Sequence, residues 1–173
     1  AKLTHVLAHQ LAFNSGLQKR GVMYPIWVSE GLATNFEFDW SAETGFTACN
    51  GVRAVSLARA HETGALIPLR EFVVLTKVPQ SPRRSRRCYA QAWAFFRYLL
   101  SERPEQLHGY LSRLAKLPEG RRSSTTLLRE FTESFGSLEE LEASWGLFIA
   151  RQQDSGDRSD GGRGSAMKTT LRR

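Results

Sequence analysis

The segment 87–102 constrains the fold of this chain most strongly. Its large apolar residues recur at steps of four, three and four, as Tyr89, Trp93, Phe96 and Leu100. This spacing places them on one face of an α-helix and does not match the two-residue alternation of a half-buried strand. Similar spacing recurs elsewhere, and no segment alternates convincingly with period two. The sequence therefore predicts a mainly α-helical chain.

The other predicted helices lie between turns marked by glycine and proline. They span residues 2–15, 26–38, 50–62, 69–75, 104–117, 124–135 and 138–152. A polar, glycine-containing loop is expected through residue 47, and Ser137 with Glu140 has the pattern of a capping box before the last helix. Residues 153–173 contain almost no apolar side chains, so they are predicted to form a disordered basic tail rich in Gly and Ser. The expected organisation is one domain over residues 1–152, followed by that tail.

Composition sets limits on what the chain can be. With 173 residues, 41% of them hydrophobic and 24% charged, the chain can build the core of one domain and is not wholly disordered. No apolar stretch approaches the roughly 18–20 residues that a membrane helix needs. Cys49 and Cys88 can form one disulfide at most, and we interpret both as ordinary small apolar residues.

The formal net charge of +7 permits contact with nucleic acid or another polyanion. Much of it comes from four arginines in the segment 81–87, which we expect to be an exposed loop. Elsewhere charges of both signs alternate, as on solvated helix faces. No nucleic-acid partner is therefore expected. The alternative hypothesis is a basic interaction protein that uses Arg83, Arg84, Arg86 and Arg87.

His5 and His9 are the first candidates for chemistry. They are four residues apart on a predicted helix, so both imidazoles project from one face and can reach one metal ion. Catalytic zinc usually takes three protein ligands and leaves a fourth position open. Glu30, on the next predicted helix, is the obvious third ligand, and Gly31 beside it would allow close helix approach. By contrast, His61 and His108 lack ligand spacing and are expected to face solvent.

Each of these residues also has a structural interpretation. A His pair at this spacing is often accidental, and Glu30 alone would be read as a surface carboxylate. Asn50 and Arg53, near the start of a helix, either cap it or bind a substrate carboxylate, and we favour the cap. The metal interpretation depends on the His pair and Glu30 occurring together.

The segments around these residues resemble a known class of enzymes. Thr4–Ala12 and Pro25–Glu37 are similar to the metal-binding motifs of gluzincin metallopeptidases. They most resemble a bacterial family of peptidase-MA-like domains, catalogued as domain of unknown function 1570. The later segment Tyr89–Leu99 is similar to the helix that follows the metal site in such enzymes. The resemblance implies the helical part of a thermolysin-like metallopeptidase domain, with most of its sheet upstream of residue 1.

The gluzincin pattern assigns a role to each matching position. The first motif is His-Glu-x-x-His, and its two histidines hold zinc together with the later glutamate. The resemblance therefore implies His5, His9 and Glu30 as ligands of one Zn²⁺ ion. It also implies that Tyr89 hydrogen-bonds the oxyanion of the reaction. Glu37 is interpreted either as a carboxylate that orients a ligand histidine or as a surface acid.

Position 6 departs from the pattern. The family's general base is a glutamate beside the first histidine, and here that residue is Val6. Valine cannot accept a proton, so efficient hydrolysis of peptide bonds is not expected. Three explanations fit: a natural pseudoenzyme, an altered residue, or a likeness of fold alone with zinc also lost. We favour a degenerate member, because both histidines and Glu30 remain.

Two functions follow from this interpretation. The first is a zinc metallopeptidase-like protein with impaired hydrolysis. The second is a non-catalytic module that holds a peptide or protein in the same cleft. The resemblance also suggests an exported or cell-envelope location. The sequence does not identify the substrate or the oligomeric state.

Overall fold

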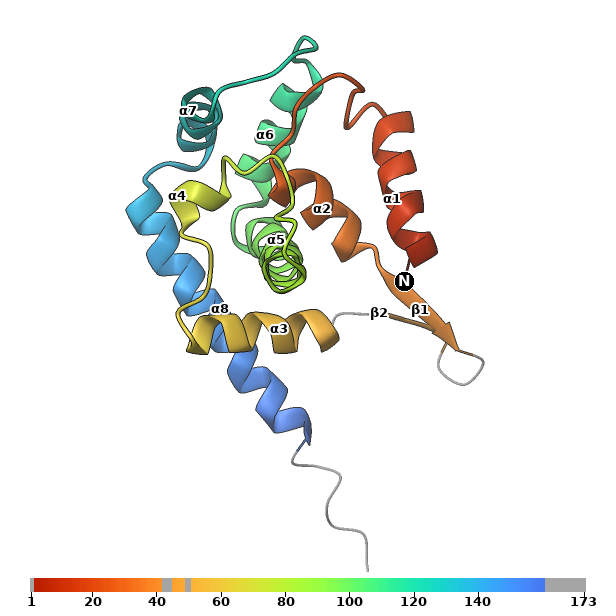
Figure 1. Cartoon of the computed structure of the whole chain (residues 1–173), viewed down its shortest axis with the longest axis vertical. Coiled ribbons are helices and arrows are strands. Elements are labelled where there is room, and N and C mark those ends of the chain that lie inside the picture. Colours follow the sequence, from red (N-terminus) through yellow and green to blue (C-terminus); the bar gives the residue numbers. More distant parts are fainter. Residues whose placement is uncertain (1, 42–44, 49–50, 161–173) are drawn as a thin grey trace, which may run out of the picture.

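The computed structural model describes residues 2–41, 45–48 and 51–160 of the chain, and in these ranges it is mainly helical. Eight helices and one small hairpin make up that part, and their arrangement can be followed in Figure 1. The helices are α1 (Lys2–Asn14), α2 (Ile26–Asn35), α3 (Gly51–Glu62), α4 (Leu69–Phe72), α5 (Pro82–Glu102), α6 (Pro104–Ala115), α7 (Ser124–Phe135) and α8 (Leu138–Asp160). None of the helices in the described ranges is both long and apolar enough to span a membrane.

Helix α5 is the centre of the fold. It runs through the middle of the molecule, and α2, α3, α6 and α8 pack against it (Figure 1). Its innermost residues are fully buried and recur at steps of four, three and four: Cys88, Ala92, Phe95 and Leu99. The predicted helix is therefore confirmed, and Trp93 and Phe96 of its predicted apolar face are buried, but burial extends beyond that face. Leu100, which shares the spacing of the predicted stripe, is 54% exposed.

An aromatic cluster fills the space between α5 and its neighbours. The Trp27 ring stacks on Tyr110 with centroids 5.3 Å apart, and Phe95 and Phe131 meet it edge to face. Aromatic rings bury large apolar areas, and stacked or edge-to-face pairs add attraction beyond that burial. This cluster fixes α2 against the rest of the core and so fixes the residues that α2 carries.

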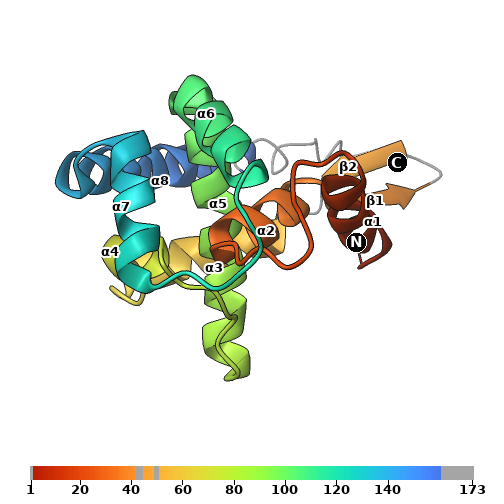
Figure 2. The same cartoon turned by 90° about the horizontal axis from the view of Figure 1, so that it is seen from above.

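Helix α2 approaches α5 closely at Gly31. A Cβ atom added there would lie 2.7 Å from the carbonyl oxygen of Ala92 and 2.9 Å from Cβ of Phe96. The close helix approach predicted at Gly31 therefore exists, and its partner is α5. Helix α1 packs on α2 at the edge of the molecule (Figure 2), and Leu3 and Leu11 on α1 are exposed.

A short hairpin replaces part of the predicted loop. Strand β1 (Phe38–Ser41) pairs antiparallel with β2 (Gly45–Ala48). The prediction of a loop through residue 47 is wrong here. Each strand has only four residues, which is too short for a convincing period-two pattern. Aromatic and β-branched residues still favour the extended backbone in that segment.

The arginine-rich segment is helical. We expected an exposed loop over residues 81–87, but α5 begins at Pro82, so Arg83, Arg84, Arg86 and Arg87 lie in its first turns. Proline at the first helical position has a preset φ and needs no hydrogen-bond partner, so it favours a helix start. This prediction is corrected: the segment is exposed for the most part, but it is not a loop.

Helix α8 starts as predicted and ends later. The Ser137 hydroxyl accepts a hydrogen bond from the Glu140 amide at 3.4 Å, which is half of the predicted capping box. The helix continues through Asp160 instead of ending at residue 152. Extending an existing helix costs far less than nucleating one, so a polar segment can continue a helix that has already formed. Residues 161–173 of the predicted tail lie outside the described residues.

Candidate metal centre

The two histidines of α1 converge as their spacing predicts. The Nε2 atoms of His5 and His9 are 3.2 Å apart. Their rings meet edge to face, with centroids 4.8 Å apart and an angle of 79° between planes. Both side chains are partly buried between α1 and α2. The pair therefore presents two imidazole nitrogens to one small volume.

Glu30 completes the group from α2. Its Oε2 atom lies 3.3 Å from Nε2 of His5 and 3.7 Å from Nε2 of His9. This oxygen is buried and has no hydrogen-bond partner in the described structure. A buried carboxylate oxygen without a hydrogen bond is costly, and a bound cation would offset that cost.

The three atoms fit a metal ion. Within the described ranges, His5, His9 and Glu30 form the one group of three potential ligands whose atoms lie within 4.8 Å of one another. Zinc with bonds of about 2.0–2.1 Å to nitrogen or oxygen, in tetrahedral geometry, requires ligand atoms about 3.3 Å apart. The observed separations of 3.2, 3.3 and 3.7 Å are close to that value. The group could hold a metal ion with little movement of its side chains.

Glu37 lies on the other side of the His5 ring. The Nδ1 atom of His5 donates a hydrogen bond to Oε1 of Glu37 at 2.8 Å. With the proton on Nδ1, Nε2 has a free lone pair that points towards Glu30 and His9. Carboxylates commonly orient metal-binding histidines in this way. Of the two interpretations of Glu37, the structure supports the orienting carboxylate, since this residue is only 7% exposed.

Arg53 of α3 holds Glu37 in turn. Its Nη2 atom donates to both carboxylate oxygens at 2.6 Å, and its Nε donates to Oε2 at 2.9 Å. The cap predicted for Arg53 is therefore replaced by a multidentate ion pair, while Asn50 lies outside the described residues. Sequence reasoning missed this role. The available signal was Glu37 itself, because an acid needs a cationic partner when it is buried. The helix predicted over residues 26–38 ends earlier, at Asn35, so Glu37 lies just after α2 and not on its face.

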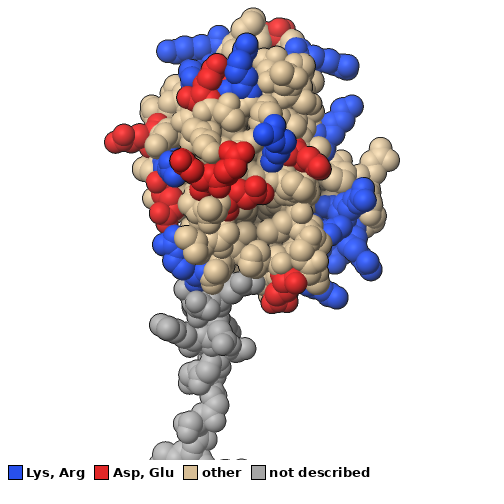
Figure 3. Space-filling view, turned by 90° about the vertical axis from the view of Figure 1, so that its left-hand side faces the viewer, with Lys and Arg blue, Asp and Glu red and all other residues tan. Residues whose placement is uncertain are grey.

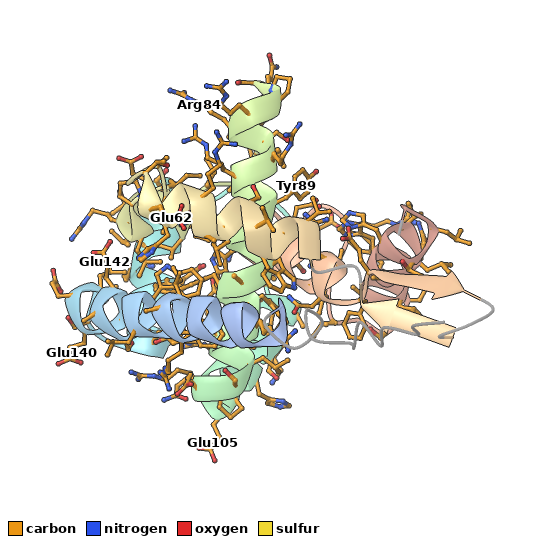
Figure 4. The ribbon with its side chains drawn as sticks, turned by 90° about the horizontal axis from the view of Figure 1, so that it is seen from below. Glu62, Arg84, Tyr89, Glu105, Glu140 and Glu142 are labelled. Carbon is orange, nitrogen blue, oxygen red and sulfur yellow. The ribbon has the colours of Figure 1, made fainter. Side chains whose placement is uncertain are left out.

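Tyr89 of α5 borders the cluster. Its ring centroid is 6.5 Å from that of His5, and the Arg53 guanidinium carbon lies 5.7 Å from the centre of the Tyr89 ring. Figure 4 shows Tyr89 near the crossing of α5 and α3. Burial, and then the charge of Glu30, raise the pKa of Tyr89. Its phenol therefore keeps its proton at neutral pH and can act as a hydrogen-bond donor.

Val6 occupies the position next to His5 and is 54% exposed. Its side chain offers no proton acceptor. Glu37 does not replace it, because that carboxylate faces Nδ1 of His5 and is bound by Arg53.

His108 is exposed on α6, as predicted, whereas His61 is partly buried on α3. Cys88 is fully buried, and burial raises the pKa of its thiol to about 11, which fits an inert apolar role. Cys49 lies outside the described residues.

Comparison with known protein families identifies the chain's relatives. The model of one family, described as protein of unknown function (DUF1570), matches residues 1–119. The chain belongs to the DUF1570 family. The DUF1570 match includes the His5, His9 and Glu30 cluster, Glu37, Arg53 and Tyr89, and it ends between α6 and α7. Searches of curated proteins and of solved structures gave no match.

Proposed function

We propose that this DUF1570 chain is a zinc metallopeptidase-like protein of the gluzincin type, with hydrolysis impaired by Val6. His5, His9 and Glu30 would hold the ion. The observation that carries the proposal is the spacing of their three atoms, 3.2 to 3.7 Å, around a carboxylate oxygen that is buried without a hydrogen bond. The proposed architecture is the helical part of a thermolysin-like domain, with the His pair on one helix and the glutamate on the next.

The chain's own residues would have distinct roles. Glu37, held by Arg53, keeps the His5 ring in one orientation and one tautomer. Tyr89 has a protonated phenol that would donate to negative charge on a substrate carbonyl oxygen. When bound, zinc supplies Lewis-acid polarisation and lowers the pKa of water towards about 7.

A general base is the missing part. General acid–base catalysis contributes roughly 10²–10⁴-fold to an enzymatic rate. Val6 supplies none of it, and Glu37 is engaged with His5 and Arg53 on the wrong side of the imidazole. We therefore expect slow hydrolysis or none in the natural chain.

A second candidate function is favoured by two observations, the missing general base at Val6 and the ion pair between Arg53 and Glu37. A module with an ordered ligand group, and without a base, would hold a peptide or protein without cutting it. The ordered ion pair of Arg53 with Glu37 supports it, because this pair preserves the geometry of the His5 ring although the catalytic position is lost. The two candidates share the metal centre and differ in turnover.

The first experiment is the zinc content of the folded protein. We would dialyse the protein against a metal-buffered solution and measure zinc by elemental analysis, with His5→Ala as the test variant. His108→Ala is the matched control, because His108 is an exposed histidine on α6. About one zinc per chain is expected in the natural protein and the control, and almost none in His5→Ala. No zinc in a well-folded natural protein would overturn the metal-centred proposal.

A further inference from the structure

A second site lies beside the metal centre. A groove of about 540 Å³ is lined by arginines from two helices, namely Arg59 of α3 and Arg83, Arg86 and Arg87 of α5. The end of α5 that carries them projects from the body of the molecule, as Figure 4 shows at Arg84. None of the acidic side chains in the described ranges lines this groove. It is therefore a concave surface of one charge sign.

The positive charges of the groove are not neutralised by ion pairs among the residues that the structure describes. Among the described residues, the ion pairs include none that involves Arg59, Arg83 or Arg86. Arg87 donates to the backbone oxygen of Ala65 at 3.2 Å, which fixes its position at the groove. Figure 3 shows the contrast, with acidic and basic side chains interspersed over much of another face of the molecule.

The placement of these arginines has a cost. The first turn of α5 contains basic residues and no acidic ones. Cations at a helix N-terminus oppose the helix dipole, and like charges near one another repel. A solvated face would tolerate single arginines. Four arginines from two helices around one groove indicate an anionic ligand.

The groove lies on the same two helices as Arg53 and Tyr89. Arg53 and Tyr89 touch at the cluster. Ser56, which lines the groove, follows Arg53 by three residues on α3, and Arg86 precedes Tyr89 by three residues on α5. Residues three apart on a helix are neighbours on one face, so the groove begins about one helical turn from Arg53 and Tyr89, which border the cluster. An extended peptide advances about 3.3 Å per residue, so a short extended segment could contact both sites.

We propose that this groove binds the carboxylates of Asp and Glu side chains in an extended peptide whose adjacent residues lie at the metal centre. The proposal rests on the proposed function, because it names the peptide class that the same site would receive. Guanidinium groups pair with carboxylates through two parallel hydrogen bonds, which suits arginine for this recognition. Single-stranded nucleic acid is disfavoured, because among the described residues no aromatic side chain lines the groove to stack on bases.

The test is the affinity for a fluorescein-labelled peptide of alternating Glu and Ala, measured by anisotropy. The same peptide with Gln in place of Glu is the ligand control. The test variant is Arg59→Gln/Arg83→Gln/Arg86→Gln. The matched variant is Arg20→Gln/Arg97→Gln/Arg121→Gln, which removes three exposed arginines outside the groove. Folding of both variants is checked by circular dichroism.

We expect the groove variant to bind the Glu peptide at least about tenfold more weakly, and the matched variant to change affinity less than about twofold. Equal losses in the two variants would overturn the proposal, as would equal binding of the Glu and Gln peptides. Tighter, arginine-dependent binding of a single-stranded oligonucleotide would overturn it in favour of nucleic acid.

Zinc is measured on the same samples to separate the two proposals. Arginine-dependent peptide binding by a chain without zinc would leave the groove in place and overturn the metal-centred function. One zinc per chain without binding of the Glu peptide would support the metal-centred function and overturn the peptide-binding groove.

Discussion

The Nδ1 atom of His5 lies 2.8 Å from Oε1 of Glu37, a residue 32 positions later in the chain. Arg53 of α3 donates hydrogen bonds to the same carboxylate. The orientation of the His5 ring therefore depends on α1, α3 and the end of α2 together. This chain of contacts leads to the first prediction.

Replacing Glu37 with glutamine should weaken metal binding. The amide can still accept from Nδ1, but it lacks the charge that raises the basicity of the imidazole and balances Arg53. Loss of such an outer carboxylate typically costs about 10–100-fold in metal affinity. A competition titration with a chromophoric chelator measures it, and Glu140→Gln on the exposed start of α8 is the control. Unchanged zinc affinity in Glu37→Gln would show that the contact is only structural.

Val6→Glu should create peptidase activity without altering zinc content. The new carboxylate occupies the position at which the gluzincin pattern has its general base, next to His5. We expect an increase of roughly 10²–10⁴-fold in the hydrolysis of a fluorogenic casein substrate, which is the usual contribution of such a group. Val6→Gln is the control, because the glutamine side chain has nearly the shape of glutamate but lacks a basic carboxylate. If a folded, zinc-loaded Val6→Glu protein is no faster than the natural chain, more than the base is missing.

Tyr89→Phe, combined with Val6→Glu, should lower that activity. The phenol would be lost as an oxyanion donor, and removing one such donor commonly costs about 10²–10³-fold in kcat. Because burial raises the pKa of Tyr89, the donor stays protonated through neutral pH, and its loss should affect kcat equally from pH 6 to 9. The zinc content should not change. A pH-dependent effect confined to the alkaline range would contradict the assignment.

The cluster could be predicted from the sequence because its signals are local. The spacing of His5 and His9 follows from one helical turn, and Glu30 lies in a short segment with a recognisable pattern. The structure brings all three together, and it places Glu37 and Tyr89 beside them. Zinc, hydrolysis and the gluzincin assignment remain predictions.

Features that depend on long-range contacts were not visible in the same way. The sequence pattern at Arg53 fits a helix cap equally well, and only the packing of α3 beside the end of α2 brings it to Glu37. The strongest helical spacing was found at Tyr89 and Trp93, yet the fully buried stripe of α5 runs through Cys88 and Ala92. The spacing does not show that α5 is packed against α2, α3, α6 and α8, which bury residues outside the predicted stripe, Phe95 among them.

Stability should fall at alkaline pH through Cys88. Burial raises the pKa of this thiol from 9.0 to about 11 in the folded chain. Above pH 9 the unfolded chain therefore loses this proton first, and the folded state is destabilised by up to about 2–3 kcal/mol by pH 11. Urea unfolding from pH 8 to 11 measures the effect, which should be absent from Cys88→Ala. Parallel pH profiles in the two proteins would contradict the prediction.

Gly31→Ala should destabilise the fold and, with it, the position of Glu30. The added Cβ would lie 2.7 Å from the backbone oxygen of Ala92 and 2.9 Å from Cβ of Phe96, so α2 and α5 would have to separate. Overpacking of this kind costs about 1–3 kcal/mol.

The matched control is Gly109→Ala on α6, where an added Cβ meets nothing within 4 Å. That variant should gain about 0.5–1 kcal/mol, because alanine favours a helix more than glycine does. Urea unfolding measures both free energies, and a stabilised Gly31→Ala would mean that α2 and α5 do not pack as closely as described. Zinc affinity should fall in Gly31→Ala alone, because only that substitution displaces the helix that carries Glu30.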